Sequence, residues 1–387
     1  MAQLREEAYK LMSQSPLIDG HNDWLHMIRA YYDFQVDDRF EPQKSLAGHV
    51  DIKRLREGKA GGVFWSLYID CPKQENDLSD EVHFEGLRDT LQQVDLAHRV
   101  VNLYRDSLEM AYRADDILPI FESGKCVSLL GIEGLHQICN SSSVLRVLYQ
   151  LGVRYATLAH NQNNLYADSA TSKAPLHHGL SPQGRDMIRE MNRIGMMIDL
   201  SHVSEAVMSD VLELSQAPVV FTHSSCYALV PHPRNVPDHI IAKLGEKRGL
   251  LMVSFIPWLT NKNKDEASLN DVVDHIMHVG TMIGYDHVGL GSDFDGMPTQ
   301  INGLDDVASY VNVVSTMLER GIASDDIKKV MGLNLIRVMK EVELAAGRMA
   351  ATPALEDKVK QLWSNDIRTF VRKLYSHAEH DKPRDQD

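Results

Sequence analysis

The chain has 387 residues, and its 40 Lys and Arg against 54 Asp and Glu give a formal net charge of −14 at pH 7. This balance argues against a nucleic-acid partner, because nucleic-acid binders carry a basic surplus or stripe. Hydrophobic residues make up 43% and charged residues 24%, which excludes a disordered or fibrous chain and predicts a large core.

Eight short β-rich apolar runs alternate with stretches of helical period from residue 17 to about residue 335. Most of these runs are apolar on both faces, as expected of parallel strands that are covered by helices. The runs are residues 16–21, 62–69, 126–134, 153–160, 196–202, 218–225, 250–256 and 287–296.

Between the runs, several segments of helical period start at capping residues and end at glycine. Ser181 stands before Pro182, Ser204 stands before Glu205, and Gly195 closes one segment. The expected helices are residues 86–105, 143–151, 182–194, 204–215, 238–247, 268–283 and 305–320, with two or three more within 325–378.

Eight strands that are each followed by a helix, without a break in composition, predict a single α/β domain. We expect a (β/α)8 TIM barrel over residues 11–340 and a C-terminal helical extension with a polar tail over residues 341–387. An open doubly wound sheet is the alternative, because sequence alone does not show closure.

The cysteines and the chain ends predict a cytoplasmic protein without a membrane partner. The four cysteines show no paired spacing such as CxxC, which favours a reducing compartment. We find no secretory signal, no lipid-anchor signal, and no run near the ~20 apolar residues that span a membrane. The cysteines are Cys71, Cys126, Cys139 and Cys226.

Polar residues interrupt six of the runs at their carboxyl ends, which is where barrel enzymes keep their active sites. Three histidines from neighbouring strands and several carboxylates are therefore expected at one mouth. The residues are Asp19, Gly20, His21, Asn22 and Asp23 after the first run, then Glu133, His160, His202, His223, Asp293 and Asp295 after later ones.

Five of these residues form a candidate ligand set for two metal ions. His21 and Asp23 are two apart in an extended segment, so both side chains point to one face and can chelate one divalent cation. Taken singly, each of these strand-end histidines is more typical of a core or loop residue than of a metal ligand. Together with His202 and His223, Glu133 can bridge two cations, and a water that two cations share ionises near neutral pH and becomes the nucleophile. Other divalent transition metals also accept such ligands.

Seven motifs in order over about residues 17–340 resemble the membrane (renal) dipeptidase family of binuclear zinc metallopeptidases, which have an amidohydrolase-like barrel. The motifs are DGHND, GIEG, RYATLAHN, DLSHVS, FTHSS, RNVPD and GSDFDG. The resemblance implies two zinc ions per subunit, one held by His21, Asp23 and Glu133 and the other by Glu133, His202 and His223. It also assigns His160, Arg234 and Asp293 to substrate handling.

The chemistry of these three residues fits hydrolysis of a dipeptide with a free C-terminal carboxylate by a metal-bridging hydroxide. Arg234 can hold that carboxylate in a two-point grip. His160 can donate to the oxyanion that forms from the peptide carbonyl. Asp293 can move the proton from the water to the leaving amine, with Asp295, which we expect to point similarly, as its rival. Trp24, Tyr68, Asn163 and Tyr166 are candidates for the side-chain pocket, or they simply pack.

The resemblance is closest to intracellular fungal members, because this chain lacks the signals and the cysteine pairing of the anchored ones. Such members include dipeptidases of secondary metabolism, of the type that serves gliotoxin-like chemistry, which remove glycine from Cys-Gly units of glutathione-derived adducts. A general cytosolic dipeptidase fits equally well. Related enzymes are often dimers, so we expect a homodimer.

Three other functions stay open. One is another binuclear hydrolase on the same barrel, such as a deaminase, lactonase or acylase, against which Arg234 and a bridging Glu133 in place of a bridging lysine argue. The others are a barrel that binds a peptide without cleaving it and a scaffold whose barrel is incidental.

Overall fold

The computed structural model describes residues 2–74 and 77–379, and the chain divides into two compact units, Met1–Leu355 and Glu356–Asp387. The first unit is built on eight parallel strands. They are β1 (Ile18–Asn22), β2 (Gly62–Ser66), β4 (Cys126–Glu133), β5 (Val153–Thr157), β6 (Met197–Asp199), β7 (Val220–Ser224), β8 (Leu250–Val253) and β9 (Val288–Leu290).

These strands close into a barrel, which confirms the predicted (β/α)8 fold and rules out the open sheet. The order around the ring is β2-β1-β9-β8-β7-β6-β5-β4, and β2 pairs back onto β4. The closing register aligns Gly62–Ser66 with Val127–Gly131, all in parallel. Because every strand runs the same way, all eight carboxyl ends meet at one mouth.

A ninth strand, β3 (Leu108–Met110), was not predicted. It pairs in parallel with Cys126–Ser128 at the beginning of β4, whereas β5 pairs with the end of β4. Only Leu108 of its three residues is buried, so β3 leaves no apolar run in the sequence.

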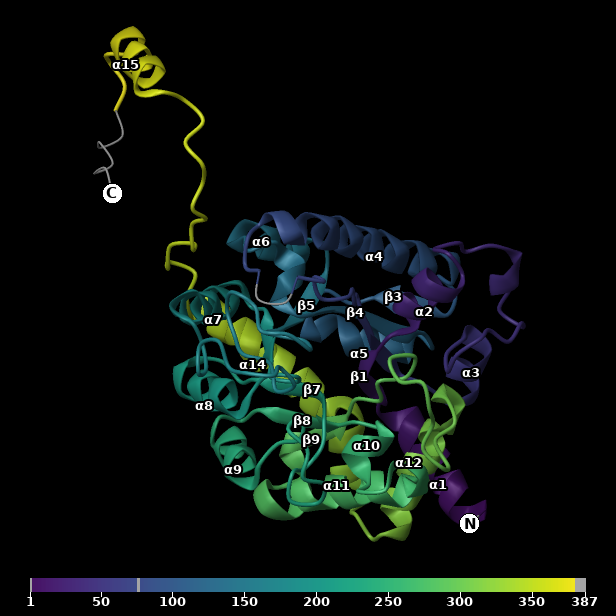
Figure 1. Cartoon of the computed structure of the whole chain (residues 1–387). Helices are drawn as coiled ribbons and strands as arrows, with labels where there is room; N and C mark the ends of the chain where they lie inside the picture. The colour runs from purple at the N-terminus through teal and green to yellow at the C-terminus, as the bar shows by residue number, and fades with distance from the viewer. Residues whose placement is uncertain (1, 75–76, 380–387) are drawn as a thin grey trace. The chain divides into compact units, whose positions relative to one another are not determined.

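Helices surround the strands in the first unit (Figure 1). Ser181 and Ser204 accept hydrogen bonds from the backbone N–H groups of Gly184 and Val207, and Gly195 ends its helix with a φ of 84°, so these caps are as predicted. The helices are α1 (Ala2–Gln14), α2 (Trp24–Tyr31), α3 (Ile52–Glu57), α4 (Phe84–Leu103), α5 (Ala114–Glu122), α6 (Ser142–Gln150), α7 (Pro182–Ile194), α8 (Glu205–Leu214), α9 (Asp238–Glu246), α10 (Pro257–Thr260), α11 (Leu269–Ile283), α12 (Tyr310–Glu319), α13 (Ser324–Lys328) and α14 (Asn334–Arg348).

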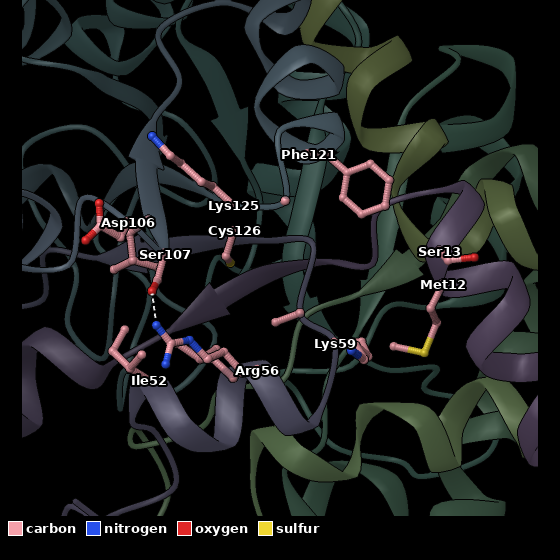
Figure 2. A pocket seen from close by; sticks show the side chains of 14 residues that line it. Met12, Ser13, Ile52, Arg56, Lys59, Asp106, Ser107, Phe121, Lys125 and Cys126 are labelled. Carbon is pink, nitrogen blue, oxygen red and sulfur yellow. Dashed lines mark hydrogen bonds between the residues drawn. The ribbon is translucent and has the colours of Figure 1, made fainter. Parts of the chain in front are cut away.

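The strands form the core, and their two ends differ in chemistry. All eight positions of β4 are buried, as expected of a strand that is covered on both faces. At its amino end, Cys126 borders a cavity of about 280 Å³ in which the guanidinium of Arg56 donates to the hydroxyl of Ser107 over 2.6 Å (Figure 2). At its carboxyl end stands Glu133.

The second unit contains α15 (Asn365–Leu374), which begins where the Ser364 hydroxyl accepts from the N–H of Ile367. None of its residues is buried. Among the described residues, no helix is both long and apolar enough to cross a bilayer. The predicted polar tail falls partly on residues 380–387, which lie outside the described part of the chain.

Candidate metal centre

Glu133, the last residue of β4, lies at the centre of the barrel mouth. Its Oε1 lies 3.0 Å from Nε2 of His202 and 3.2 Å from Nε2 of His223, and its Oε2 lies 3.6 Å from Nε2 of His21. Histidines from three other strand ends thus approach both oxygens of one buried carboxylate, which is the arrangement that a bridging ligand needs.

Asp23 completes the side of the centre that faces β1. His21 belongs to β1 and Asp23 follows it at the start of α2, yet the His21 Nε2 and an Asp23 carboxylate oxygen are 3.2 Å apart. An oxygen of Asp293, from the loop after β9, lies 3.7 Å from the same nitrogen. The two side chains of the HxD motif therefore converge as expected.

The donor set fits divalent metal ions. The side chains form three groups of three residues, the ligand atoms within each group lie within 4.8 Å of one another, and two of the groups share Glu133. The Nε2 atoms of His202 and His223 are only 2.9 Å apart, and Nε2 of His21 is buried without a hydrogen-bond partner among the described residues. The groups are His21, Glu133 and His223; Glu133, His160 and His202; and His21, Asp23 and Asp293.

The pKa shifts of the buried carboxylates and histidines also favour binding of a cation at the centre. Burial raises the pKa of Glu133 and that of Asp293 well above their usual values, and the negative charge of neighbouring carboxylates raises both further. Burial alone would lower the pKa of His21, but the charges of Glu133, Asp23 and Asp293 raise it to about 10. Burial holds the pKa of His202 and His223 well below the usual value, so both imidazoles are neutral and able to ligate.

Hydrogen bonds to the outer ring nitrogens orient two of the ligand histidines, and these partners were not predicted. The Tyr155 hydroxyl lies 2.8 Å from Nδ1 of His21, and the Thr222 hydroxyl lies 2.9 Å from Nδ1 of His223. The Thr222 hydroxyl also donates to Asp199 over 2.8 Å, so it accepts from His223 and leaves Nε2 free for a metal. In the sequence, Tyr155 and Thr222 look like ordinary strand residues.

Arg234 and His160 flank the centre. The Arg234 guanidinium is 3.4 Å from both the hydroxyl of Ser224 and the carbonyl oxygen of His223. Burial lowers its pKa to about 10, and nearby carboxylates act in the opposite direction, so it stays charged at neutral pH. Nε2 of His160 lies 3.8 Å from Glu133.

Asp293 and Asp295 do not point the same way, which corrects the sequence-based expectation. Both residues adopt left-handed φ angles, 63° and 67°, so the alternation of an extended strand does not apply. Asp293 faces the centre, whereas an Asp295 oxygen accepts from the N–H of His49, and the Asp295 N–H donates to His49 Nδ1 over 2.9 Å.

Two of the four residues considered for a side-chain pocket have structural roles instead. Trp24 is fully buried against Trp65, and the Asn163 side chain bonds the backbone of Ala174 and Ser169. Tyr166 is also buried. Tyr68 remains at the centre, with its ring 4.9 Å from that of His160. All four cysteines are free.

Comparison with known proteins places the chain in a protein family. The sequence model of the family described as "Membrane dipeptidase (Peptidase family M19)" matches residues 5–353. The chain is 61% identical to Dipeptidase tcpJ of Claviceps purpurea over 97% of this chain and 94% of that one, and 44% identical to Dipeptidase verJ of Clonostachys rogersoniana over 95% of each. Among solved structures, a metallopeptidase from Rhodobacter sphaeroides, liganded with a phosphinate mimic of the dipeptide L-Ala-D-Ala, has a TM-score of 0.74 at 24% identity and covers 85% of this chain and 99% of its own.

Proposed function

The chain belongs to the membrane dipeptidase family, peptidase family M19, and is a metallo-dipeptidase, and we propose that it is a binuclear zinc enzyme that binds the free carboxylate of dipeptide-like substrates. The observation that carries the proposal is Glu133, whose two carboxylate oxygens are approached by His21 on one side and by His202 and His223 on the other.

The residues of the centre divide into two ligand sets that share Glu133. His21, Asp23 and Glu133 would hold one ion, and Glu133, His202 and His223 the other. When bound, the ions supply Lewis acidity, which polarises a carbonyl and lowers the pKa of water.

Arg234 would bind the substrate carboxylate. Arg234 is 5% exposed and its guanidinium lies beside the carbonyl oxygen of His223, so an incoming carboxylate meets a planar donor in a buried site. A requirement for a free carboxylate one residue beyond the scissile bond limits cleavage to the last peptide bond of a substrate.

His160 would stabilise the oxyanion that forms from the peptide carbonyl, and Asp293 would transfer the proton. Burial lowers the pKa of His160 well below its usual value, so the ring is neutral at pH 7 and one of its nitrogens can donate to the developing oxyanion. Asp293, with a raised pKa and an oxygen that faces His21, would accept the proton of the attacking water and return it to the leaving amine.

For the substrate, we propose that the chain removes glycine from Cys-Gly units of glutathione-derived adducts in fungal secondary metabolism. The similarity to fungal dipeptidases supports this role, and the phosphinate dipeptide mimic bound by the Rhodobacter protein supports a dipeptide-like substrate. We further propose a cytoplasmic homodimer, which sedimentation and cell fractionation test.

The experiment is glycine release from Cys-Gly, from an S-substituted Cys-Gly and from L-Ala-Gly, with L-Ala-D-Ala alongside. Metal-loaded protein and a chelated control run in parallel. We expect fast, metal-dependent release of glycine. If metal-loaded protein cleaves none of the dipeptides but turns over a nucleobase or a lactone, the protein is a deaminase or a lactonase and the proposal is wrong.

A further inference from the structure

A second cavity, of about 370 Å³, lies beside the metal centre. Its walls come from residues 68–74 after β2, from His26 and Arg29 of α2, from His136, and from the beginning of α4. We call it the β2 cavity. Its volume is within the range of small-molecule sites, which is roughly 300–1,000 Å³.

The β2 cavity adjoins the metal centre at Cys71 and Tyr68, which both approach the His160 ring. Cys71 lines the cavity, and its Sγ lies 3.9 Å from Nδ1 of His160. Nε2 of His160, on the other side of the ring, lies 3.8 Å from Glu133. Tyr68, which also lines the cavity, packs edge-on against the His160 ring.

The walls carry polar groups that the protein itself does not satisfy. His83 is only 3% exposed, yet neither of its ring nitrogens has a hydrogen-bond partner among the described residues. Nδ1 of His26 is also buried without one. A buried polar atom without a partner destabilises the folded protein, so two such rings at one cavity indicate a site for a polar ligand. Charged side chains of both signs also line the cavity, and two of them, Arg29 and Asp89, pair with each other over 2.7 Å; the others are Asp70, Lys73 and Glu85.

The topology sets the direction in which a substrate points. In the ring of eight strands, β2 is four strands away from β7 in either direction, so the two lie on opposite sides of the mouth. Arg234 sits against the end of β7 through the His223 carbonyl and the Ser224 hydroxyl. A dipeptide whose carboxylate is held by Arg234 therefore directs its N-terminal residue toward β2.

We propose that the β2 cavity receives the side chain of the substrate's N-terminal residue and suits a large polar substituent rather than a short aliphatic one. This inference rests on the proposed function, because it takes Arg234 as the carboxylate site.

Gly86 allows the cavity to be filled without touching the metal centre. It lies in the first turn of α4 and lines the cavity, and an added Cβ would meet only Ile69 Cδ1, at 3.0 Å, the end of a flexible side chain. Gly86→Met places a long side chain there and replaces a poor helix former with a good one, so the helix should not weaken. Gly347→Met is the matched control, because Gly347 lies in α14 and its Cβ would meet nothing within 4 Å.

The substrates are L-Ala-Gly and Cys-Gly alkylated on sulfur with N-ethylmaleimide. We expect the wild type to cleave the adduct with a kcat/KM at least equal to that for L-Ala-Gly. Gly86→Met should lower kcat/KM for the adduct by about tenfold, through KM, and change that for L-Ala-Gly by less than about twofold. Gly347→Met should change neither.

His83→Phe provides an independent readout, because it keeps a ring and removes both nitrogens. A merely structural His83 predicts a higher Tm and unchanged selectivity, whereas a ligand-binding His83 predicts a higher KM for the adduct alone. Equal effects of Gly86→Met on both substrates, or an adduct that resists cleavage while L-Ala-Gly is hydrolysed, would overturn the inference. Failure of metal-loaded wild type to hydrolyse L-Ala-Gly would instead remove the proposed function.

Discussion

The Tyr155 hydroxyl and Nδ1 of His21 lie 2.8 Å apart inside the barrel, and both side chains are fully buried. A hydroxyl that accepts from Nδ1 fixes the proton there and leaves Nε2 as the nitrogen that faces Asp23 and Glu133. Gly131 of β4 makes the pair possible, since a Cβ at that position would collide with the Tyr155 ring.

Tyr155→Phe should therefore weaken metal binding without unfolding the barrel. The loss of a hydrogen bond to a ligand histidine typically costs about 10- to 100-fold in metal affinity, and competition with a chelator measures it. Tyr104→Phe is the matched control, because the hydroxyl of Tyr104 donates to the Phe40 carbonyl. Equal affinities in wild type and Tyr155→Phe would show that Tyr155 does not position His21.

Asp293→Asn should reduce the catalytic rate, whereas Asp295→Asn should reduce the stability of the fold. Asp293 faces His21, so its amide should lower kcat by at least about 100-fold, the scale of a lost general base. Asp295 holds the His49 backbone, so its amide should lower Tm while activity per folded molecule stays near that of wild type. Thermal unfolding and steady-state rates test both, and the reverse assignment would make Asp295 the proton carrier.

Much of the barrel and its ligand set could be predicted from the sequence, because each signal lies in residue type and strand-end position. The four ligands lie at or just after the carboxyl ends of buried strands, and closure of the barrel brings them together; they are His21, Glu133, His202 and His223. In contrast, β3 is too short and too exposed to produce an apolar run.

Side-chain direction and partnership were harder to predict than position. The left-handed φ angles at Asp293 and Asp295 turn two neighbouring carboxylates apart, and a pattern of alternation does not show such a turn. Tyr155 pairs with His21 across 134 residues, and its place within an apolar strand gave no sign of that contact. Trp24 shows the opposite case, because an aromatic residue near a site packed into the core.

Arg234→Ala should reduce cleavage only of substrates that carry a free carboxylate. Loss of a buried, charged hydrogen-bond partner costs about 2–5 kcal/mol, so kcat/KM for L-Ala-Gly should fall by at least about 30-fold. The C-terminal amide of the same dipeptide should be a poor substrate for wild type and should lose little more in the variant. A fall of the same size for both substrates would mean that Arg234 does not read the carboxylate.

His275 should make the metal-free protein less stable as the pH falls from about 6.5 to about 4. Burial lowers its pKa from 6.5 to about 4, and its ring accepts from the Cys226 N–H while it donates to the Thr260 carbonyl. Between these values the unfolded chain binds a proton that the folded chain excludes, at a cost of up to about 3 kcal/mol.

His275→Gln keeps one donor and one acceptor but does not titrate, so its stability should depend less on pH over this range. Urea unfolding of metal-free wild type and variant at pH 7, 6 and 5 measures the difference. Parallel pH dependences would show that His275 contributes nothing to acid sensitivity.

Two metal ions that share Glu133 are central to the proposed mechanism, and a titration tests this directly. Apo-protein is loaded stepwise with zinc, and bound metal and glycine release from L-Ala-Gly are measured on the same samples. We predict that activity reaches its plateau at about two ions per chain and that Glu133→Gln, folded by circular dichroism, binds fewer and hydrolyses nothing. Full activity at one ion per chain, or hydrolysis that survives chelation or Glu133→Gln, would contradict the account.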